Sequence, residues 1–173
     1  MIRLKCLCAV ALLGLAPAVR AADSVANALR DAGSLATCMK ALDTECTIKW
    51  TYTKLLEQQG FALTTLRAQL NVSFENIRVA QGKIERLELG AAASPFPGDG
   101  KQYIFIPYLE TMNLQGQVYS QTAYFIGLSD DGGVSWKFVD GFGFSQKNIR
   151  EVIPSYGGGP LPPRATDPAT ALP

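Results

Sequence analysis

Hydrophobic positions recur at helical spacing in the first half of the chain. In residues 24–43 they lie three or four positions apart, which predicts a helix capped by Asp23 or Ser24. Residues 44–59 fit both the helical and the strand period, and the glycine directly behind them favours a helix. Residues 61–70 predict a further, shorter helix.

The second half changes to the two-residue alternation that is typical of strands. Four segments show this alternation: residues 84–89, 103–112, 118–128 and 135–140. They are separated by turns rich in Gly, Pro, Asn and Asp. They predict an antiparallel meander, and Ser145 behind it begins a short helix that Pro154 ends. The order predicts an α+β fold, in which N-terminal helices pack on a curved four-stranded meander and a short C-terminal helix follows.

The first residues have the pattern of an export signal. Two basic residues precede an apolar run that Pro17 interrupts, and small residues suit cleavage after Ala21. The run is too short to span a bilayer core of about 30 Å. We therefore expect a signal peptide (1–21), a single cone-like domain (22–156) and a Pro- and Gly-rich, disordered tail (157–173), in a periplasmic or secreted protein.

Charge and cysteine content narrow the possible functions. The whole chain has 16 basic and 15 acidic residues, and removal of the signal makes the balance slightly negative, unlike a nucleic-acid-binding surface. Cys38 and Cys46 remain after export and predict one structural disulfide, which contributes about 2–3 kcal/mol. Their spacing is not C-x-x-C and the chain has no His, so we expect no metal or cofactor site.

The strongest turn signal is S-D-D-G-G-V-S-W at residues 129–136. It resembles the Asp-box, S-x-D-x-G-x-[ST]-W, a hairpin found in sialidases and many unrelated β proteins. The resemblance implies a self-bonded structural turn with its Trp packed inward, remote from any chemistry. The residues at the specified positions are Ser129, Asp131, Gly133, Ser135 and Trp136.

The layout as a whole resembles nuclear-transport-factor-2-like and cystatin-like domains, in which helices pack into the hollow of a bent sheet. Residues 123–141, with Pro154 and the late L-P-P at 161–163, are similar to a group of small exported bacterial proteins of unassigned function. The resemblance implies a cone-like fold in the bacterial envelope and no particular activity.

Candidates for catalysis are few because the chain has no His. A carboxylate beside a Tyr in the hollow of the sheet could act instead, as in ketosteroid isomerase. Four acids could point inward: Asp43, Glu57, Glu110 and Asp140. They form no motif, so the sequence leaves catalysis open and leans away from an enzyme.

Aromatic side chains of the strands could line a ligand pocket or simply fill the core. The candidates are Tyr103, Phe105, Tyr108, Tyr119, Tyr124 and Trp136. An edge strand near Ile84 or Pro107 could instead pair with a partner or with a second copy, which would give a homodimer.

These observations predict an exported, non-enzymatic binding domain whose partner is an envelope protein or a small apolar ligand. One alternative is a pocket enzyme of the isomerase or dehydratase type that uses a carboxylate with Tyr. Another is a periplasmic inhibitor or immunity-type protein, for which a protruding loop at residues 92–100 would be the first suspect.

Overall fold

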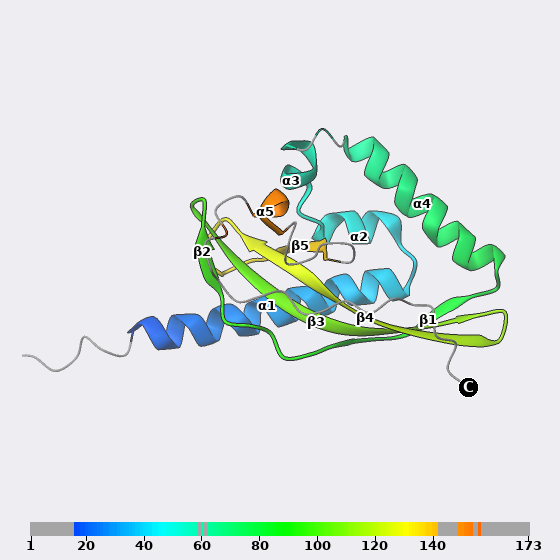
Figure 1. Cartoon of the computed structure of the whole chain (residues 1–173), viewed down its shortest axis with the longest axis horizontal. Coiled ribbons are helices and arrows are strands. Elements are labelled where there is room, and N and C mark those ends of the chain that lie inside the picture. Colours follow the sequence, from blue (N-terminus) through cyan, green and yellow to red (C-terminus); the bar gives the residue numbers. More distant parts are fainter. Residues whose placement is uncertain (1–15, 59, 61, 142–148, 154–155, 157–173) are drawn as a thin grey trace, which may run out of the picture.

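The computed structural model describes residues 16–58, 60, 62–141, 149–153 and 156. Within them, helices precede an open antiparallel sheet (Figure 1), and the predicted α+β class is confirmed. The helices are α1 (Ala16–Lys40), α2 (Thr44–Trp50), α3 (Thr53–Gln58), α4 (Leu63–Val79) and α5 (Ile149–Val152). The strands are β1 (Lys83–Leu89), β2 (Phe96–Gly98), β3 (Lys101–Leu114), β4 (Gln117–Ser129) and β5 (Lys137–Asp140).

The sheet has the order β1-β3-β4-β5, which confirms the predicted meander. β3 and β4 form a long hairpin that ends at a two-residue turn, where Gln115 and Gly116 have φ values of 54° and 83°. Positive φ at both positions is the geometry that matches the twist of paired strands. β2, which pairs with the start of β3, was not predicted because Pro97 argues against a central strand, whereas an edge tolerates proline.

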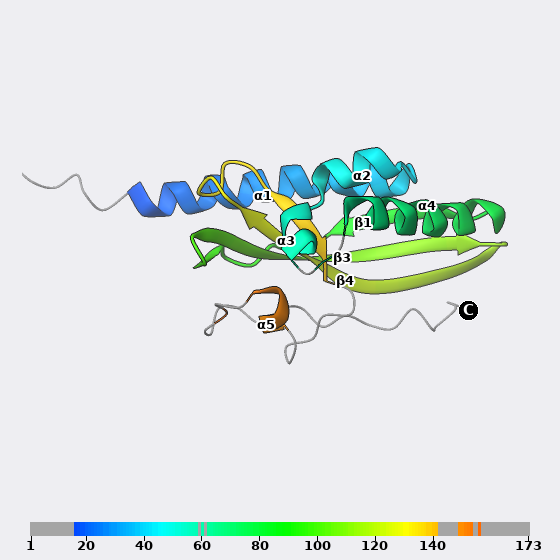
Figure 2. The same cartoon turned by 90° about the horizontal axis from the view of Figure 1, so that it is seen from above.

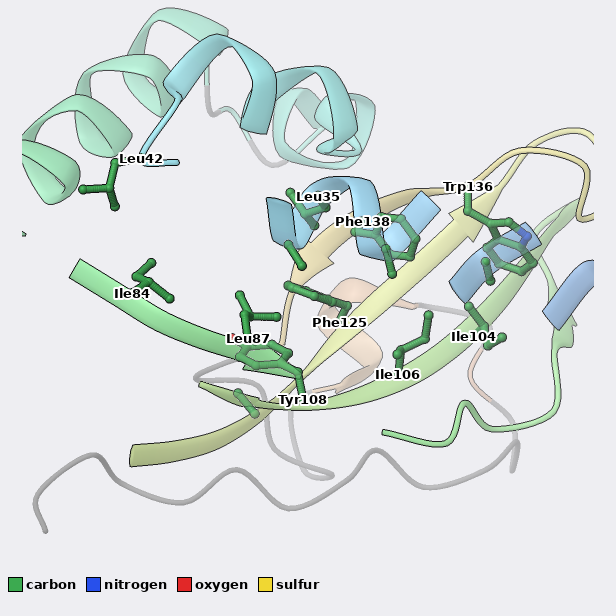
Figure 3. Packing of buried hydrophobic residues seen from close by; sticks show 14 of the residues in the cluster. Leu35, Leu42, Ile84, Leu87, Ile104, Ile106, Tyr108, Phe125, Trp136 and Phe138 are labelled. Carbon is green, nitrogen blue, oxygen red and sulfur yellow. The ribbon is translucent and has the colours of Figure 1, made fainter. Parts of the chain in front are cut away.

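The two faces of the sheet are covered by different parts of the chain (Figure 2). α1, α2 and α4 lie on one side, where Leu35 packs in a core that includes Phe125 and Trp136 (Figure 3). Phe74 of α4 belongs to the same core. α5 lies on the other side, and its Ile149 belongs to a second core. Side chains alternate between the faces along each strand, so β3 and β4 contribute to both cores.

Two helix predictions need correction. α1 begins at Ala16, upstream of the predicted caps, because alanine favours helix; the Ser24 hydroxyl donates to Gln102 Oε1 at 3.3 Å instead. α4 runs to Val79, well past the predicted end at Leu70, and its second half is anchored by the buried Phe74. Tertiary packing therefore extends this helix beyond the local signal.

The predicted disulfide is confirmed. Cys38 near the end of α1 and Cys46 in α2 are bonded, with their Cα atoms 5.4 Å apart. The link between α2 and α3 then reaches the free side of β5, where Thr51 forms a parallel bridge with Phe138 and the Tyr52 amide donates to the Phe138 carbonyl at 2.8 Å. This link covers the β5 edge of the sheet at Phe138.

Several predictions fall outside the described residues. They include most of the expected export signal, the Ser145 cap and the tail at residues 157–173. α5 is only a short turn of four residues, so it does not confirm the predicted C-terminal helix. None of the helices described is long and apolar enough to cross a membrane.

Candidate functional site

The turn between β4 and β5 is held by its own side chains. The Ser129 hydroxyl donates to Asp131 Oδ1 at 2.7 Å and accepts the Gly133 amide at 2.8 Å. Asp131 also accepts the amides of Val134 and Ser135, each at 3.0 Å, and the Ser135 hydroxyl at 2.5 Å. Desolvation alone would raise the pKa of Asp131, but these hydrogen bonds outweigh it and lower that pKa to about 2.

Helix α1 clamps this turn from the other side. Asn27 Nδ2 donates to the Gly133 carbonyl at 3.1 Å, and the buried Asp31 accepts the Trp136 amide at 2.9 Å. Gly133 has a φ of 94°, and a Cβ there would lie 2.1 Å from Ser24 Oγ, so only glycine fits. Trp136 is fully buried, and its indole N–H donates to the Gly133 carbonyl at 3.2 Å. The turn is thus continuous with the core.

The six aromatic pocket candidates do not gather around one cavity. Two belong to the core on the helix-covered face: Tyr108 and Trp136. Three belong to the core on the opposite face: Tyr103, Phe105 and Tyr124. All five are almost fully buried, whereas Tyr119 lies half-buried towards the hairpin tip and donates its hydroxyl to Gln117 Oε1 at 2.6 Å. The structure therefore places most of these side chains as core residues.

A polar cluster on the helix-covered face comes closest to the catalytic alternative; Glu110 and Tyr108 are buried in it, whereas Asp140 is exposed. Glu110 is 6% exposed and accepts a hydrogen bond from Gln121 Nε2; burial raises the pKa of Glu110 despite that hydrogen bond. The Tyr108 hydroxyl donates to Asp140 Oδ1 at 3.1 Å, and burial, with the Asp140 charge, raises the pKa of Tyr108. Neither acid lines the three surface pockets described below.

The other two acids lie away from this cluster. Asp43 is the N-cap of α2 and accepts the Cys46 amide at 3.0 Å, while Glu57 is exposed on α3. Across the described part of the chain, no group of three His, Cys, Asp or Glu side chains is arranged to hold a metal ion.

The surface of the described residues includes the following three pockets, and Tyr108 is the one aromatic candidate that lines any of these three. A groove of about 400 Å³ lies between the α2–α3 link and the β4–β5 turn. A hollow of about 340 Å³ lies on the sheet around Pro107 and Leu109, and another of about 510 Å³ lies along α4 at Val72.

The strand at one edge of the sheet is heavily charged. β1 carries four charged side chains: Lys83, Glu85, Arg86 and Glu88. The ammonium of Lys83 lies 3.2 Å from Glu85, and Arg86 pairs with Glu88. Charges along an edge strand disfavour pairing with another chain, so β1 is protected against such pairing.

The tip of β4 presents an uncharged edge. β5 pairs with β4 at residues 125–128, and the Gly141 amide donates to the Tyr124 carbonyl at 2.8 Å. Among the described residues, no strand pairs with residues 117–121 on this side. Because outward-facing groups alternate along a strand, Val118 and Ser120 direct their N–H and C=O groups away from β3, as Tyr124 does.

The sequence pointed to a different edge. Ile84 does lie in an edge strand, but that strand is charged, and Pro107 lies in the interior strand β3, where its carbonyl accepts the Gly90 amide at 2.7 Å. The signal for the β4 edge was the mismatch in length between the predicted strands 118–128 and 135–140. A long strand beside a short one must leave part of its edge unpaired.

Comparison with protein-family models finds no match to this chain. Comparison with curated proteins and with solved structures finds none either. We therefore infer the function from the surfaces of the described residues, among which the uncharged edge of β4 is the most distinctive.

Proposed function

We propose that this chain is an exported, non-enzymatic interaction domain, and that residues 117–121 of β4 pair with an extended segment of an envelope protein. The single observation that carries the proposal is the uncharged stretch of β4 that no described strand covers. Such an edge offers backbone donors and acceptors in the spacing that an added strand requires. Five residues match the usual length of a short strand.

The packing of the interior favours a protein partner rather than a ligand enclosed in the hollow of the sheet. The predicted hollow is filled by aromatic rings, for example Tyr108 and Phe125 with centroids 4.4 Å apart. The loop suspected of an inhibitory role is docked, since the ring of Phe96 lies 5.7 Å from that of Tyr103 and 5.4 Å from that of Phe105. These contacts favour recognition through backbone pairing.

Export is compatible with the contacts of α1. Cleavage after Ala21 would shorten this helix but leave Ser24, Asn27 and Asp31, the side chains that contact Gln102 and the β4–β5 turn. The mature chain would thus keep the hydrogen bonds by which α1 holds the β4–β5 turn.

Two substitutions at Ser120 test the proposal. Ser120→Pro removes an outward amide and places a ring on the edge, and strands tolerate proline where the amide faces solvent. Ser120→Ala is the matched control: it removes only the side chain, whose hydroxyl lies 3.1 Å from Thr111 Oγ1, and keeps the amide. Wild-type and variant chains are tagged, exported in the native host, purified gently and examined by mass spectrometry for bound proteins.

We expect one protein to accompany the wild type and Ser120→Ala and to be lost from Ser120→Pro. A second copy of the chain that shows this same pattern would identify the partner as the protein itself. A partner retained equally by all three chains, or no partner with any of them, would contradict the proposal.

A further inference from the structure

The groove between the α2–α3 link and the β4–β5 turn lies apart from the open edge and has a different chemistry. Its volume of about 400 Å³ is in the range of small-molecule sites. Lys49, Lys54 and Lys137 line it together with a single carboxylate, Asp130. The lining therefore has a net positive charge in a mature chain whose overall balance is slightly negative.

Two of the ammonium groups converge on one aromatic ring. The Nζ atoms of Lys49 and Lys137 lie 5.7 Å and 5.1 Å from the ring centroid of Trp50, within cation–π range. Lys137 Nζ also donates to the Lys49 carbonyl, which holds it close to its neighbour. Among the described residues, neither lysine forms an ion pair with a carboxylate. Within the described part of the chain, these two positioned cations thus lack a carboxylate counterion.

The carboxylate of the groove is already engaged. Asp130 accepts hydrogen bonds from Lys54 Nζ at 2.8 Å and from the Tyr52 hydroxyl at 2.9 Å. The hydrogen bond from Lys54 lowers the pKa of Asp130 and outweighs desolvation, so this carboxylate stays ionised and neutralises Lys54. The remaining positive charge is therefore concentrated at Lys49 and Lys137, with the hydroxyl of Thr53 in the same lining.

We propose that this groove binds a phosphate group, carried either by a soluble molecule or by a lipid headgroup, with Lys49 and Lys137 as its counterions. Lysine is a point charge that suits phosphate, whereas bidentate recognition of a carboxylate favours the fork of arginine, and no arginine lines this groove. A soluble phosphate monoester carries about −1.5 to −2 charge at pH 7, and the phosphodiester of a lipid headgroup carries a single negative charge; two unpaired ammonium groups are complementary to either.

Titration with inorganic phosphate tests the site directly. Calorimetry and Trp fluorescence are recorded for the exported mature chain, for the double variant Lys49→Gln/Lys137→Gln, and for Lys83→Gln as a control on β1 that removes one exposed lysine outside the groove. We expect saturable binding by the wild type, affinity lower by about tenfold or more in the double variant, and affinity within about twofold of wild type in the control. Circular dichroism verifies that each variant is folded.

Vesicles of phosphatidylglycerol, compared with vesicles of phosphatidylcholine, distinguish the two sources of phosphate. Flotation with phosphatidylglycerol that is lost in the double variant would assign a lipid headgroup. Binding of inorganic phosphate without flotation would assign a soluble phosphate compound. If neither probe binds, or if Lys83→Gln weakens binding as much as the double variant does, the site does not exist. Because Ser120 lies outside the groove, these outcomes are independent of the edge-pairing experiment.

Discussion

The two ends of strand β4 differ in how they are held. Residues 123–129 are buried, are covered by a core on each face and lead into a turn that α1 clamps. Residues 117–121 are exposed or half-buried, and their outward backbone groups have no described strand beside them. One end of the strand is therefore held by the fold, while the other should tolerate change at little cost to stability.

The largest effect is expected at the clamped end, from Trp136→Ala. Trp136 is fully buried in the helix-side core, and removal of such a side chain costs about 3–5 kcal/mol of unfolding free energy. Urea denaturation followed by circular dichroism measures the loss. A loss below about 1 kcal/mol would contradict this assignment, because the clamped end would then contribute no more to stability than an exposed position.

A smaller effect is expected from Asp31→Ala on α1. The substitution leaves the buried Trp136 amide without its acceptor, which costs about 1–3 kcal/mol. Arg30→Ala is the matched control, since the Arg30 side chain is 61% exposed and such an ion pair contributes at most about 1 kcal/mol. Equal losses for the two variants would show that α1 does not clamp the turn through Asp31.

The pH dependence of stability separates Glu110 from the acids at the surface. Its pKa is raised in the folded state, so the folded protein holds this proton more tightly than the unfolded chain does. The associated stability is present below the unfolded pKa of about 4.3 and declines as pH rises through the folded pKa. Glu110→Gln should flatten the decline in melting temperature as pH rises above the unfolded pKa; an unchanged slope would exclude Glu110 as its source.

The smallest effect on stability is expected at the open end, from Ser120→Pro. Its amide faces away from β3, so unfolding free energy should change by less than about 0.5–1 kcal/mol. Tyr119→Pro is the contrasting variant, because by strand alternation that amide faces β3, and its loss should cost more. If both prolines destabilise the fold equally, the edge at Ser120 is not open.

Much of this fold was predictable from local patterns. Alternation indicated the four strands of the meander, and Cys38 and Cys46, the two cysteines that would remain after the expected export, indicated a disulfide. The contacts of Asn27 and Asp31 with the turn were not predictable, because they join positions more than a hundred residues apart. No local signal marks such tertiary contacts.

The two-residue period of the strands also bears on the aromatic pocket candidates. The period of two that indicated the strands also places Phe105 and Tyr108 on opposite faces, so a shared pocket was improbable from sequence alone. The open edge depended on how strands of unequal length pair, and the lysine groove depended on the place where the α2–α3 link meets β5. Both are consequences of topology, which local patterns do not specify.

Amide hydrogen exchange at the β4 tip, followed by NMR, tests the central claim most directly. In the isolated mature chain, the amides of Val118 and Ser120 should exchange rapidly while that of Tyr119, which faces β3, is protected. In the complex with the co-purified partner, Val118 and Ser120 should become protected as well. Protection of both amides in the isolated monomer, or rapid exchange of both in the complex, would contradict pairing through this edge.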